Sequence, residues 1–250
     1  MKHFTLLSAI VLAIALTACS QEPADPNLES FKVKGGRVDI SCINHGSIAI
    51  SYKGYLIQVD PVKNHGGKDI DYSVFPKADL ILITHEHGDH YNQKTIEDIS
   101  KEGTRVITNG KVHEMLGYGD VMNNGDVTEA GKGITIEATP AYNTTPGRQQ
   151  FHPKGNGNGN GYLITVGGLR IFVSGDSEDI EEYSQLKDID VAFLAANQPY
   201  TMTVEQCVNA AKVINPKVLI PYHLGNTYME GIKKGLEGTD IDVRLHETLK

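Results

Sequence analysis

The chain contains no tryptophan and only three cysteines among its 250 residues. So little cysteine excludes a small scaffold that disulfides hold together. Basic residues are also a minority, because 23 Lys and Arg stand against 31 Asp and Glu, which gives a formal net charge of −8. This balance argues against a basic face that binds phosphates, and no nucleic-acid partner is expected. With 40% hydrophobic and 22% charged residues, the composition is otherwise that of a globular protein long enough to bury a core.

Long hydrophobic runs are confined to residues 4–16, which follow the basic Lys2. That run is too short to cross a bilayer comfortably, and its pattern is typical of a secretory signal. It ends in Leu16-Thr17-Ala18-Cys19, which resembles the bacterial lipobox and implies cleavage before Cys19 with lipid attached to its sulfur. An ordinary signal peptide or a buried N-terminal helix is the alternative.

We therefore expect a lipoprotein signal peptide at residues 1–18, a tether at 19–30 and the folded domain at 31–250. The polar tether contains two prolines, as a spacer between lipid and domain should. The lipid anchor would make the membrane a partner and would place the protein in the bacterial cell envelope, in the periplasm or at the outer membrane. Cys42 and Cys207 lie far apart in apolar patterns, so two buried thiols are expected.

The rest of the chain alternates strand patterns with helix patterns. Strands are expected at 38–43, 47–52, 55–59, 79–83, 105–108, 134–139, 162–166, 169–174, 191–195, 217–221 and 241–245. Helices are expected at 93–101, 111–116, 227–236 and from a capping box at Thr203 to Val213. Hairpins mixed with strand–helix units favour an α/β fold in which two sheets lie between helices. The glycine–asparagine run at 155–161 is interpreted as a flexible loop.

The strongest chemical signal is the segment Thr84-His85-Glu86-His87-Gly88-Asp89-His90, directly after the apolar strand 79–83. Three imidazoles and a carboxylate this close together would each need a buried partner if they lay in a core. Imidazole and carboxylate together suit Zn²⁺ and related divalent metals. Alternation points His85 and His87 to one side, and Asp89 and His90 would face a second centre.

This HxHxDH pattern resembles the metallo-β-lactamase superfamily of metal-dependent hydrolases. Three further segments fit it: Asp60-Pro61, Gly175-Asp176-Ser177 and Pro221-Tyr222-His223. The resemblance spans about residues 38–246 and implies an αββα four-layer sandwich with metals at the strand ends between the sheets. The turn Asn44-His45-Gly46-Ser47 is similar to that of the lactonase-like and phospholipase-D-like branch.

One position departs from the family pattern. The third histidine of the first metal site normally ends the strand that corresponds to 134–139, but this chain continues Pro140-Ala141-Tyr142-Asn143. The nearest candidate is His152, because a catalytic zinc usually takes three protein ligands and a water. Asn143 as an oxygen ligand, or a site with only one tightly held metal, remains the alternative.

The resemblance implies two divalent metal ions, expected to be Zn²⁺ with Mn²⁺ or Fe²⁺ as alternatives. The first would be held by His85, His87 and His152, and the second by Asp89, His90 and His223. Asp176 would bridge them, and Asp60 would support a ligand histidine from behind. A hydroxide between the metals would cleave an ester, lactone or phosphodiester bond in a small-molecule or lipid-like substrate. Asp89 is also placed to accept or relay a proton as a catalytic residue.

Four more residues are candidates for the reaction, each with a plainer alternative. His45 would line the pocket or donate to the leaving group, or else cap a turn. Tyr222 would donate to an oxyanion, or else pack against a sheet. Arg148 would bind an anionic group of the substrate, or else bridge surface acids. Tyr200 would line the substrate pocket, or else fix the loop before the capped helix.

His65, His113 and His246 lack such surroundings and are interpreted as surface or loop residues. Two other functions compete with hydrolysis: a di-iron redox protein on the same fold, and a non-catalytic exported lipoprotein that binds a metal or ligand. A β-lactamase is disfavoured, because zinc lactamases of the best-known type carry Cys where this chain has Asp176. The oligomeric state has no signal in the sequence.

Overall fold

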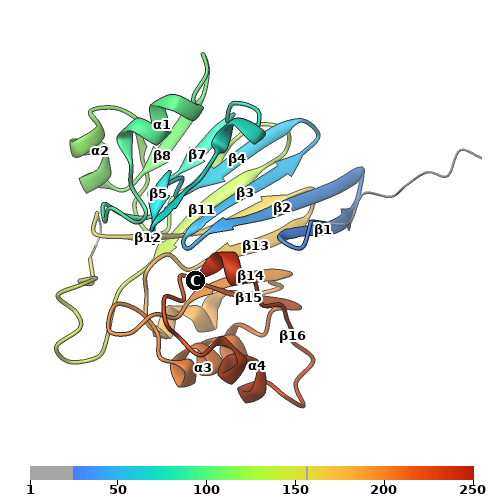
Figure 1. Ribbon diagram of the computed structural model, residues 1–250, viewed down its shortest axis with the longest axis vertical. Coiled ribbons are helices and arrows are strands. Elements are labelled where there is room, and N and C mark those ends of the chain that lie inside the picture. Colours follow the sequence, from blue (N-terminus) through green and yellow to red (C-terminus); the bar gives the residue numbers. More distant parts are fainter. Residues whose placement is uncertain (1–24, 156) are drawn as a thin grey trace, which may run out of the picture.

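The computed structural model describes residues 25–155 and 157–250 (Figure 1). The expected signal peptide, the lipidated Cys19 and the first part of the tether lie outside these residues. Within them, no helix is both long enough and apolar enough to span a membrane.

Two seven-stranded sheets form the centre of the molecule. The first has the spatial order β1 (Leu28–Val33), β2 (Gly36–Asn44), β3 (Ser47–Tyr52), β4 (Tyr55–Val59), β7 (Leu80–Leu82), β8 (Arg105–Thr108) and β9 (Asp120–Val121). The second has the order β10 (Val127–Glu129), β11 (Thr135–Pro140), β12 (Asn160–Val166), β13 (Leu169–Val173), β14 (Val191–Ala195), β15 (Val218–Tyr222) and β16 (Asp242–Val243). In each sheet the first four strands pair antiparallel and the later strands pair parallel. A separate small hairpin joins β5 (Asn64–His65) to β6 (Lys68–Asp69).

Helices cover the outer face of each sheet. Figure 1 shows α1 (Gln93–Ile99) and α2 (Gly110–Leu116) beside β7 and β8, and α3 (Val204–Ile214) and α4 (Met229–Gly235) beside β14 and β15. Short 3₁₀ helices lie at Tyr72–Val74, Glu181–Gln185 and Glu247–Leu249. One apolar core fills the space between the sheets, and two more lie under the two helix pairs. This is the expected αββα sandwich, which is confirmed.

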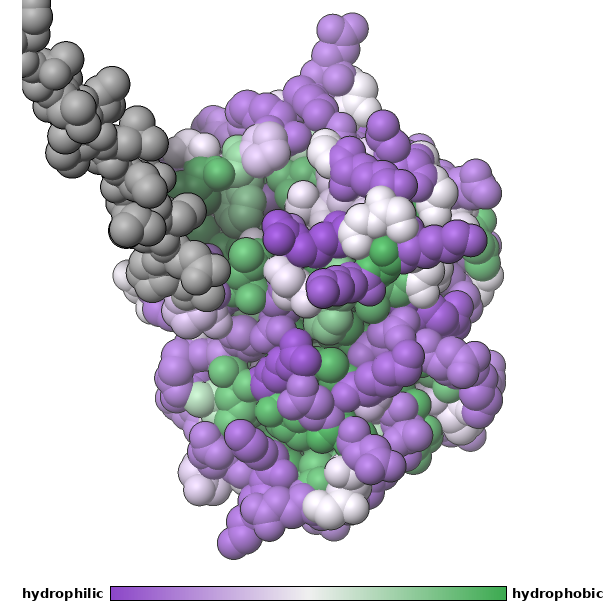
Figure 2. Space-filling model, turned by 90° about the vertical axis from the view of Figure 1, so that its right-hand side faces the viewer, coloured by the Kyte–Doolittle hydropathy of each residue, from purple (hydrophilic) through white to green (hydrophobic). Residues whose placement is uncertain are grey.

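Burial on both faces explains the continuous apolar runs in the sequence. All three residues of β7 and all five of β14 are buried, because each strand has a second sheet on one side and helices on the other. Elsewhere the face shown in Figure 2 presents hydrophilic side chains with hydrophobic ones between them. Cys42 and Cys207 are free and buried, as expected, and burial followed by the charge of Asp179 raises the pKa of Cys207 to about 12.

The expected elements are present, with differences at their ends and in the shortest strands. The last helix is shorter than 227–236, and the last strand is only Asp242–Val243. Strands β1, β5, β6, β9 and β10 were not expected, because runs of two or three residues carry no periodicity and β1 is buried only in part. The domain also begins earlier than residue 31, since Leu28 pairs with Ser41 at the start of β1.

Two segments that the sequence placed in loops are fixed in the fold. His246 is buried, and its Nε2 lies 3.0 Å from a carboxylate oxygen of Glu29, so it is not a surface residue. Asn160 and Gly161 open β12 rather than ending a flexible loop. The Asn160 side chain is fully buried and donates to the Met122 carbonyl oxygen at 2.9 Å, while its backbone N–H donates to the Thr84 carbonyl oxygen at 2.9 Å. The second sheet is thereby tied to the residue that precedes His85.

The start of α3 depends on the capping box that the sequence predicts. The Thr203 hydroxyl accepts from the Gln206 backbone N–H at 3.0 Å, and the Gln206 side chain accepts from the Thr203 backbone N–H at 2.9 Å. We expect Thr203→Ala to lower the free energy of unfolding by about 1 kcal/mol, because the Gln206 backbone N–H loses its acceptor. Urea denaturation measures this change, and Thr203→Ser is the control that keeps the hydroxyl. Equal stability of the alanine and wild-type proteins would contradict it.

Candidate metal centre

The candidate ligands come together because they follow strands that end at the same edge. His85, His87 and Asp89 lie just after β7, Asp176 follows β13, and His223 follows β15. In parallel sheets the carboxyl ends of the strands share one edge, where ligands commonly bind. The first sheet supplies the HxHxDH segment and the second sheet supplies Asp176 and His223, so the site lies between the two.

Asp176 is the common neighbour of four histidine rings. Its Oδ1 lies 3.2 Å from His90 Nε2, and its Oδ2 lies 3.3 Å from both His152 Nε2 and His223 Nε2. His85 Nε2 lies 3.8 Å from the same Oδ2. Four residues each offer one ligand atom, and these atoms lie within 4.8 Å of one another: His85, His87, His152 and Asp176. The structure therefore brings His152 to the place where the sequence leaves a ligand missing.

A second set of atoms gathers around Asp89. Its Oδ2 lies 3.2 Å from His223 Nε2, 3.4 Å from His45 Nε2 and 3.9 Å from His90 Nε2. His90, Asp176 and His223 form one candidate ligand group, and His45, Asp89 and His223 form another. His45 therefore lies among the candidate ligands, and it also lines the adjacent cavity, as the sequence indicates.

Asp60 and Thr84 determine which ring nitrogen is free to bind a metal in His85 and in His90. Thr84 Oγ1 donates to Asp60 Oδ2 at 2.7 Å, and the Thr84 backbone N–H donates to Asp60 Oδ1 at 2.8 Å. His90 Nδ1 lies 2.7 Å from Asp60 Oδ2, and a carboxylate only accepts, so this ring nitrogen carries the proton. Thr84 Oγ1 has already used its proton, so His85 Nδ1, at 2.9 Å, is the donor to it. Both rings thus keep Nε2 free, and Asp60 lies where it can support a ligand histidine, as the family resemblance implies.

The electrostatics favour the protonation states that ligands need at four of the candidate residues, but not at His90. Burial would lower the pKa of His90, but Asp176 and Asp60 outweigh it and hold that pKa well above 6.5. Burial, followed by the nearby His90, holds the pKa of His85 well below its usual value, so this ring is neutral. Burial alone would raise the pKa of Asp176, but His223 and His90 outweigh it and hold the pKa well below 3.8. Burial would also raise the pKa of Asp89, but hydrogen bonds from His223 and His45 lower it. Burial, opposed in part by Asp89, lowers the pKa of His45 to about 4.

The donor set and its spacing fit divalent metal ions. Within the described part of the chain, buried atoms with no hydrogen-bond partner include His90 Nε2, His152 Nε2 and Asp176 Oδ1, all directed into the cluster. Two nitrogens on one tetrahedral zinc lie about 3.3 Å apart, since each bond is about 2.0–2.1 Å long. His85 Nε2 and His87 Nδ1 lie 3.1 Å apart, with lone pairs that a shared cation would satisfy. Imidazole and carboxylate are the donors that Zn²⁺, Mn²⁺ and Fe²⁺ accept.

Close packing around the site requires glycine at position 46. A Cβ atom there would lie 2.9 Å from Cε1 of the His90 ring, closer than such atoms approach in proteins. Gly46 therefore lets the β2–β3 turn, which carries His45, pack directly on a candidate ligand.

The loop that carries His152 is held by Glu178, which the sequence analysis did not identify. The Glu178 side chain is fully buried, and its Oε2 accepts from the backbone N–H groups of Thr144 at 2.8 Å and Thr145 at 2.6 Å. Arg148 Nη1 lies 3.3 Å from its Oε1. Glu178 follows Asp176 by two residues, so one segment carries a candidate ligand and the anchor of another ligand's loop. A glutamate two residues after Asp176 matches no motif, so the sequence does not point to this role for Glu178.

A cavity of about 710 Å³ opens above the cluster. Tyr200 lines it, as expected, and so does Phe151, whose ring centroid lies 5.1 Å from that of Tyr200. His65 also lines it, which corrects its interpretation as a surface residue: its ring stacks on His45 with centroids 4.0 Å apart. Gly66 and Gly67 predict a turn at this point, but nothing in the sequence places that hairpin over His45.

Three residues have roles other than the chemical ones proposed from sequence. Tyr222 does not line the cavity; it is fully buried between the sheets and packs on Phe193, so the packing alternative is correct. Arg148 is paired with Glu178 and does not line the cavity, which corrects the expectation that it binds substrate. The Asn143 amide nitrogen donates to the carbonyl oxygens of Tyr200 and Arg148, while His152 is the residue that joins a candidate ligand group with Asp176.

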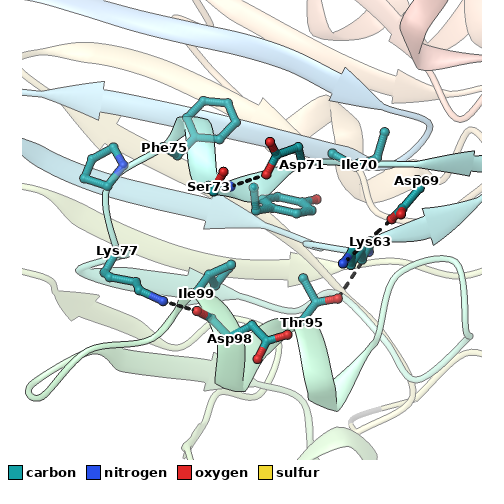
Figure 3. Close-up of a pocket in the computed structure, with 12 residues that line it drawn as sticks. Lys63, Asp69, Ile70, Asp71, Ser73, Phe75, Lys77, Thr95, Asp98 and Ile99 are labelled. Atoms are coloured by element: carbon teal, nitrogen blue, oxygen red, sulfur yellow. Dashed lines mark hydrogen bonds and ion pairs between the residues drawn. The ribbon is translucent and has the colours of Figure 1, made fainter.

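A second cavity, of about 570 Å³, lies under the 3₁₀ helix Tyr72–Val74 beside α1 (Figure 3). Its charged side chains have local partners: Lys63 faces Asp69 at 3.9 Å, and Lys77 donates to the backbone carbonyl of Asp98. All candidate ligand groups found among the described residues lie at the other cavity, so the chemistry is assigned there.

Comparison with known proteins identifies the family. The beta-lactamase superfamily domain matches residues 39–223. A UPF0173 metal-dependent hydrolase of Geobacillus thermodenitrificans is 30% identical over 201 residues, which cover 76% of this chain and 86% of that protein. A crystal structure from Parabacteroides distasonis, provisionally assigned as a metal-dependent hydrolase, is 49% identical with a TM-score of 0.83, covering 88% of this chain and 98% of that one.

The fold also occurs in an enzyme with different chemistry. CmlA of Streptomyces venezuelae, a diiron beta-hydroxylase, has a TM-score of 0.65 with 17% identity, covering 84% of this chain and 52% of that one. A likeness at this level of identity shows the shared fold alone. The family match favours hydrolysis over the di-iron redox and non-catalytic alternatives, and the chain therefore belongs to the metallo-β-lactamase superfamily, in the UPF0173 family of metal-dependent hydrolases.

Proposed function

We propose that this hydrolase uses two divalent cations, with zinc as the native metal, to cleave an ester, lactone or phosphodiester bond. The observation that carries the proposal is Asp176, whose carboxylate belongs to two candidate ligand groups at once. His85, His87 and His152 would hold the first ion, and Asp89, His90 and His223 the second. When bound, such ions supply Lewis acidity, which lowers the pKa of water and polarises the bond to be cleaved.

The remaining residues orient the reactants and handle the proton. Asp89 lies at the cavity wall, so its carboxylate is placed to accept or relay the proton released when water attacks. His45, 3.4 Å from Asp89, is neutral and can pass that proton toward the leaving group. Tyr200 and Phe151 shape the cavity in which the substrate lies. The choice among ester, lactone and phosphodiester rests on the resemblance to the lactonase-like and phospholipase-D-like branch.

A substrate panel tests the bond type. The purified protein, loaded with zinc or with manganese, is assayed on ester, lactone, thioester, phosphodiester and β-lactam substrates. We expect turnover on esters, lactones or phosphodiesters, with zinc recovered after purification without added metal. Turnover confined to β-lactams, or stoichiometric iron in place of zinc, would contradict the proposal.

The ligand assignment predicts the effect of single substitutions. We expect His87→Ala and Asp176→Ala to lose bound metal and activity while keeping the circular dichroism of the wild type, because the ligands lie at strand ends outside the apolar cores. Metal content is measured by mass spectrometry. His113→Ala is the control, since His113 lies on α2 with its ring bonded to the Gly119 carbonyl oxygen. Unchanged metal content in both ligand variants would refute the assignment.

Glu178 is proposed as a positioning residue for His152. Removing its charge weakens the contacts that hold residues 144–148, so we expect Glu178→Gln to lower metal affinity about tenfold, as outer-shell substitutions do. The exposed Glu181→Gln is the matched control. In a His152→Ala background, the same Glu178 substitution should change metal affinity little, because the ligand that it positions is absent. An equal loss of affinity in both backgrounds would instead indicate general destabilisation.

Anchoring to the cell envelope through lipid on Cys19 is also proposed, supported by the lipobox-like sequence at residues 16–19. We expect Cys19→Ser to remove the mass of the lipid and to release the protein from the membrane fraction during expression in bacteria. Cys42→Ser is the control for loss of a thiol, because Cys42 is buried. Membrane association that survives Cys19→Ser would contradict lipidation at this residue.

A further inference from the structure

The cavity above the metal centre is lined by more than ligands, and its lining points to a substrate class. We infer that the substrate is an organic anion, with an oxyanion group that Lys68 binds and an apolar group that Phe151 and Tyr200 bind. This inference rests on the proposed function, since it names the substrate class of the same site.

The charges that line the cavity balance one another, unlike those of the whole chain. The protein has a formal net charge of −8, yet the acidic side chains that line this cavity among the described residues are Asp89 and Asp176. Both belong to the candidate ligand groups, where cations would neutralise them. Two lysines also line the cavity, Lys68 and Lys250, and Lys250 is already paired with Glu247 at 2.7 Å. Lys68 is thus the cation left to meet a negative group.

The hairpin that carries Lys68 packs on the candidate metal centre through His65. On the β5–β6 hairpin, Lys68 pairs in register with His65. The His65 ring stacks on His45 at 4.0 Å, and the centroid of the His45 ring lies 3.9 Å from that of His223. Lys68 lines the same cavity as these rings, so its ammonium can meet an oxyanion on a substrate whose cleaved bond lies at the ligand atoms. An ionised partner makes such a hydrogen bond stronger than a neutral one.

Another part of the lining is aromatic. The rings of Phe151 and Tyr200 meet edge to face with centroids 5.1 Å apart, and Tyr200 remains 46% exposed. The Asn143 side-chain amide donates to the Tyr200 carbonyl oxygen at 2.6 Å, which links this aromatic pair to the loop of His152. A large exposed aromatic surface beside a catalytic centre is typical of a contact for an apolar group of the ligand.

Matched substrates test the cationic contact. Phenyl acetate and 4-acetoxybenzoate share the ester and the ring, and only the second carries a carboxylate. We expect Lys68→Ala to lower kcat/KM for 4-acetoxybenzoate about tenfold, through KM, and to leave phenyl acetate nearly unchanged, as loss of one charged hydrogen bond does. Lys63→Ala is the control, because this substitution removes the same charge from a residue that lines the other cavity (Figure 3). An unchanged ratio of the two kcat/KM values in Lys68→Ala would overturn the inference.

The aromatic contact has its own variant. We expect Tyr200→Ala to raise KM for 4-acetoxybenzoate several-fold and to leave acetoxyacetate, which lacks the ring, unaffected. Tyr228→Ala is the control, because Tyr228 is 70% exposed and lies outside the cavity. Equal effects on both substrates would overturn the aromatic part of the inference.

A binding measurement separates this inference from the proposed function. Calorimetry follows the binding of 4-hydroxybenzoate and of phenylphosphonate to the zinc-loaded protein and to its Lys68→Ala variant. Weaker binding of either anion to the variant supports Lys68 as the oxyanion contact even if neither ester is hydrolysed, and the more affected ligand identifies carboxylate or phosphate. Equal binding to both proteins, with ester turnover present, overturns the inference and leaves the hydrolase proposal intact.

Discussion

The candidate site depends on several buried histidine rings that gather around one buried carboxylate. His85, His90, His152 and His223 are all buried, and each directs a nitrogen at the buried carboxylate of Asp176. Burying unpaired polar atoms costs free energy, and several here have no partner within the described protein. Divalent cations would supply that partner to every ring at once. Metal binding would therefore stabilise this region, since the ligands gain their partner only when the ion is present.

The fold meets this constraint by dividing the ligands between two sheets. The first sheet supplies the β2–β3 turn with His45, the end of β4 with Asp60 and the segment after β7. The second supplies Asp176 after β13 and His223 after β15. Tyr162, whose hydroxyl donates to the Ile83 carbonyl oxygen at 2.7 Å, and Asn160 join the second sheet to the residues just before His85. The relative position of the two halves is thereby fixed close to the ligands.

The loop between β11 and β12 shows how a missing residue is replaced. No histidine ends β11, and His152 reaches the cluster from a loop that Glu178 and Asn143 hold by their hydrogen bonds. Arg148, which looked like an anion-binding group in the sequence, neutralises Glu178 inside that loop. The same loop carries Phe151 into the substrate cavity. This loop therefore contributes both a candidate metal ligand and part of the cavity lining.

Patterns in the sequence predicted the αββα architecture and the buried thiols, which the structure confirms, and they pointed to the HxHxDH segment, Asp176, His223 and Asp60 as candidate site residues. These follow from apolar runs and ligand types at strand ends, which are local patterns. Long-range packing places His45 among the candidate ligand atoms, His65 against it and Tyr222 inside the core. The same packing brings His152 into a candidate ligand group with Asp176. These outcomes depend on contacts between segments far apart in the chain, and residue spacing along one segment carries no information about them.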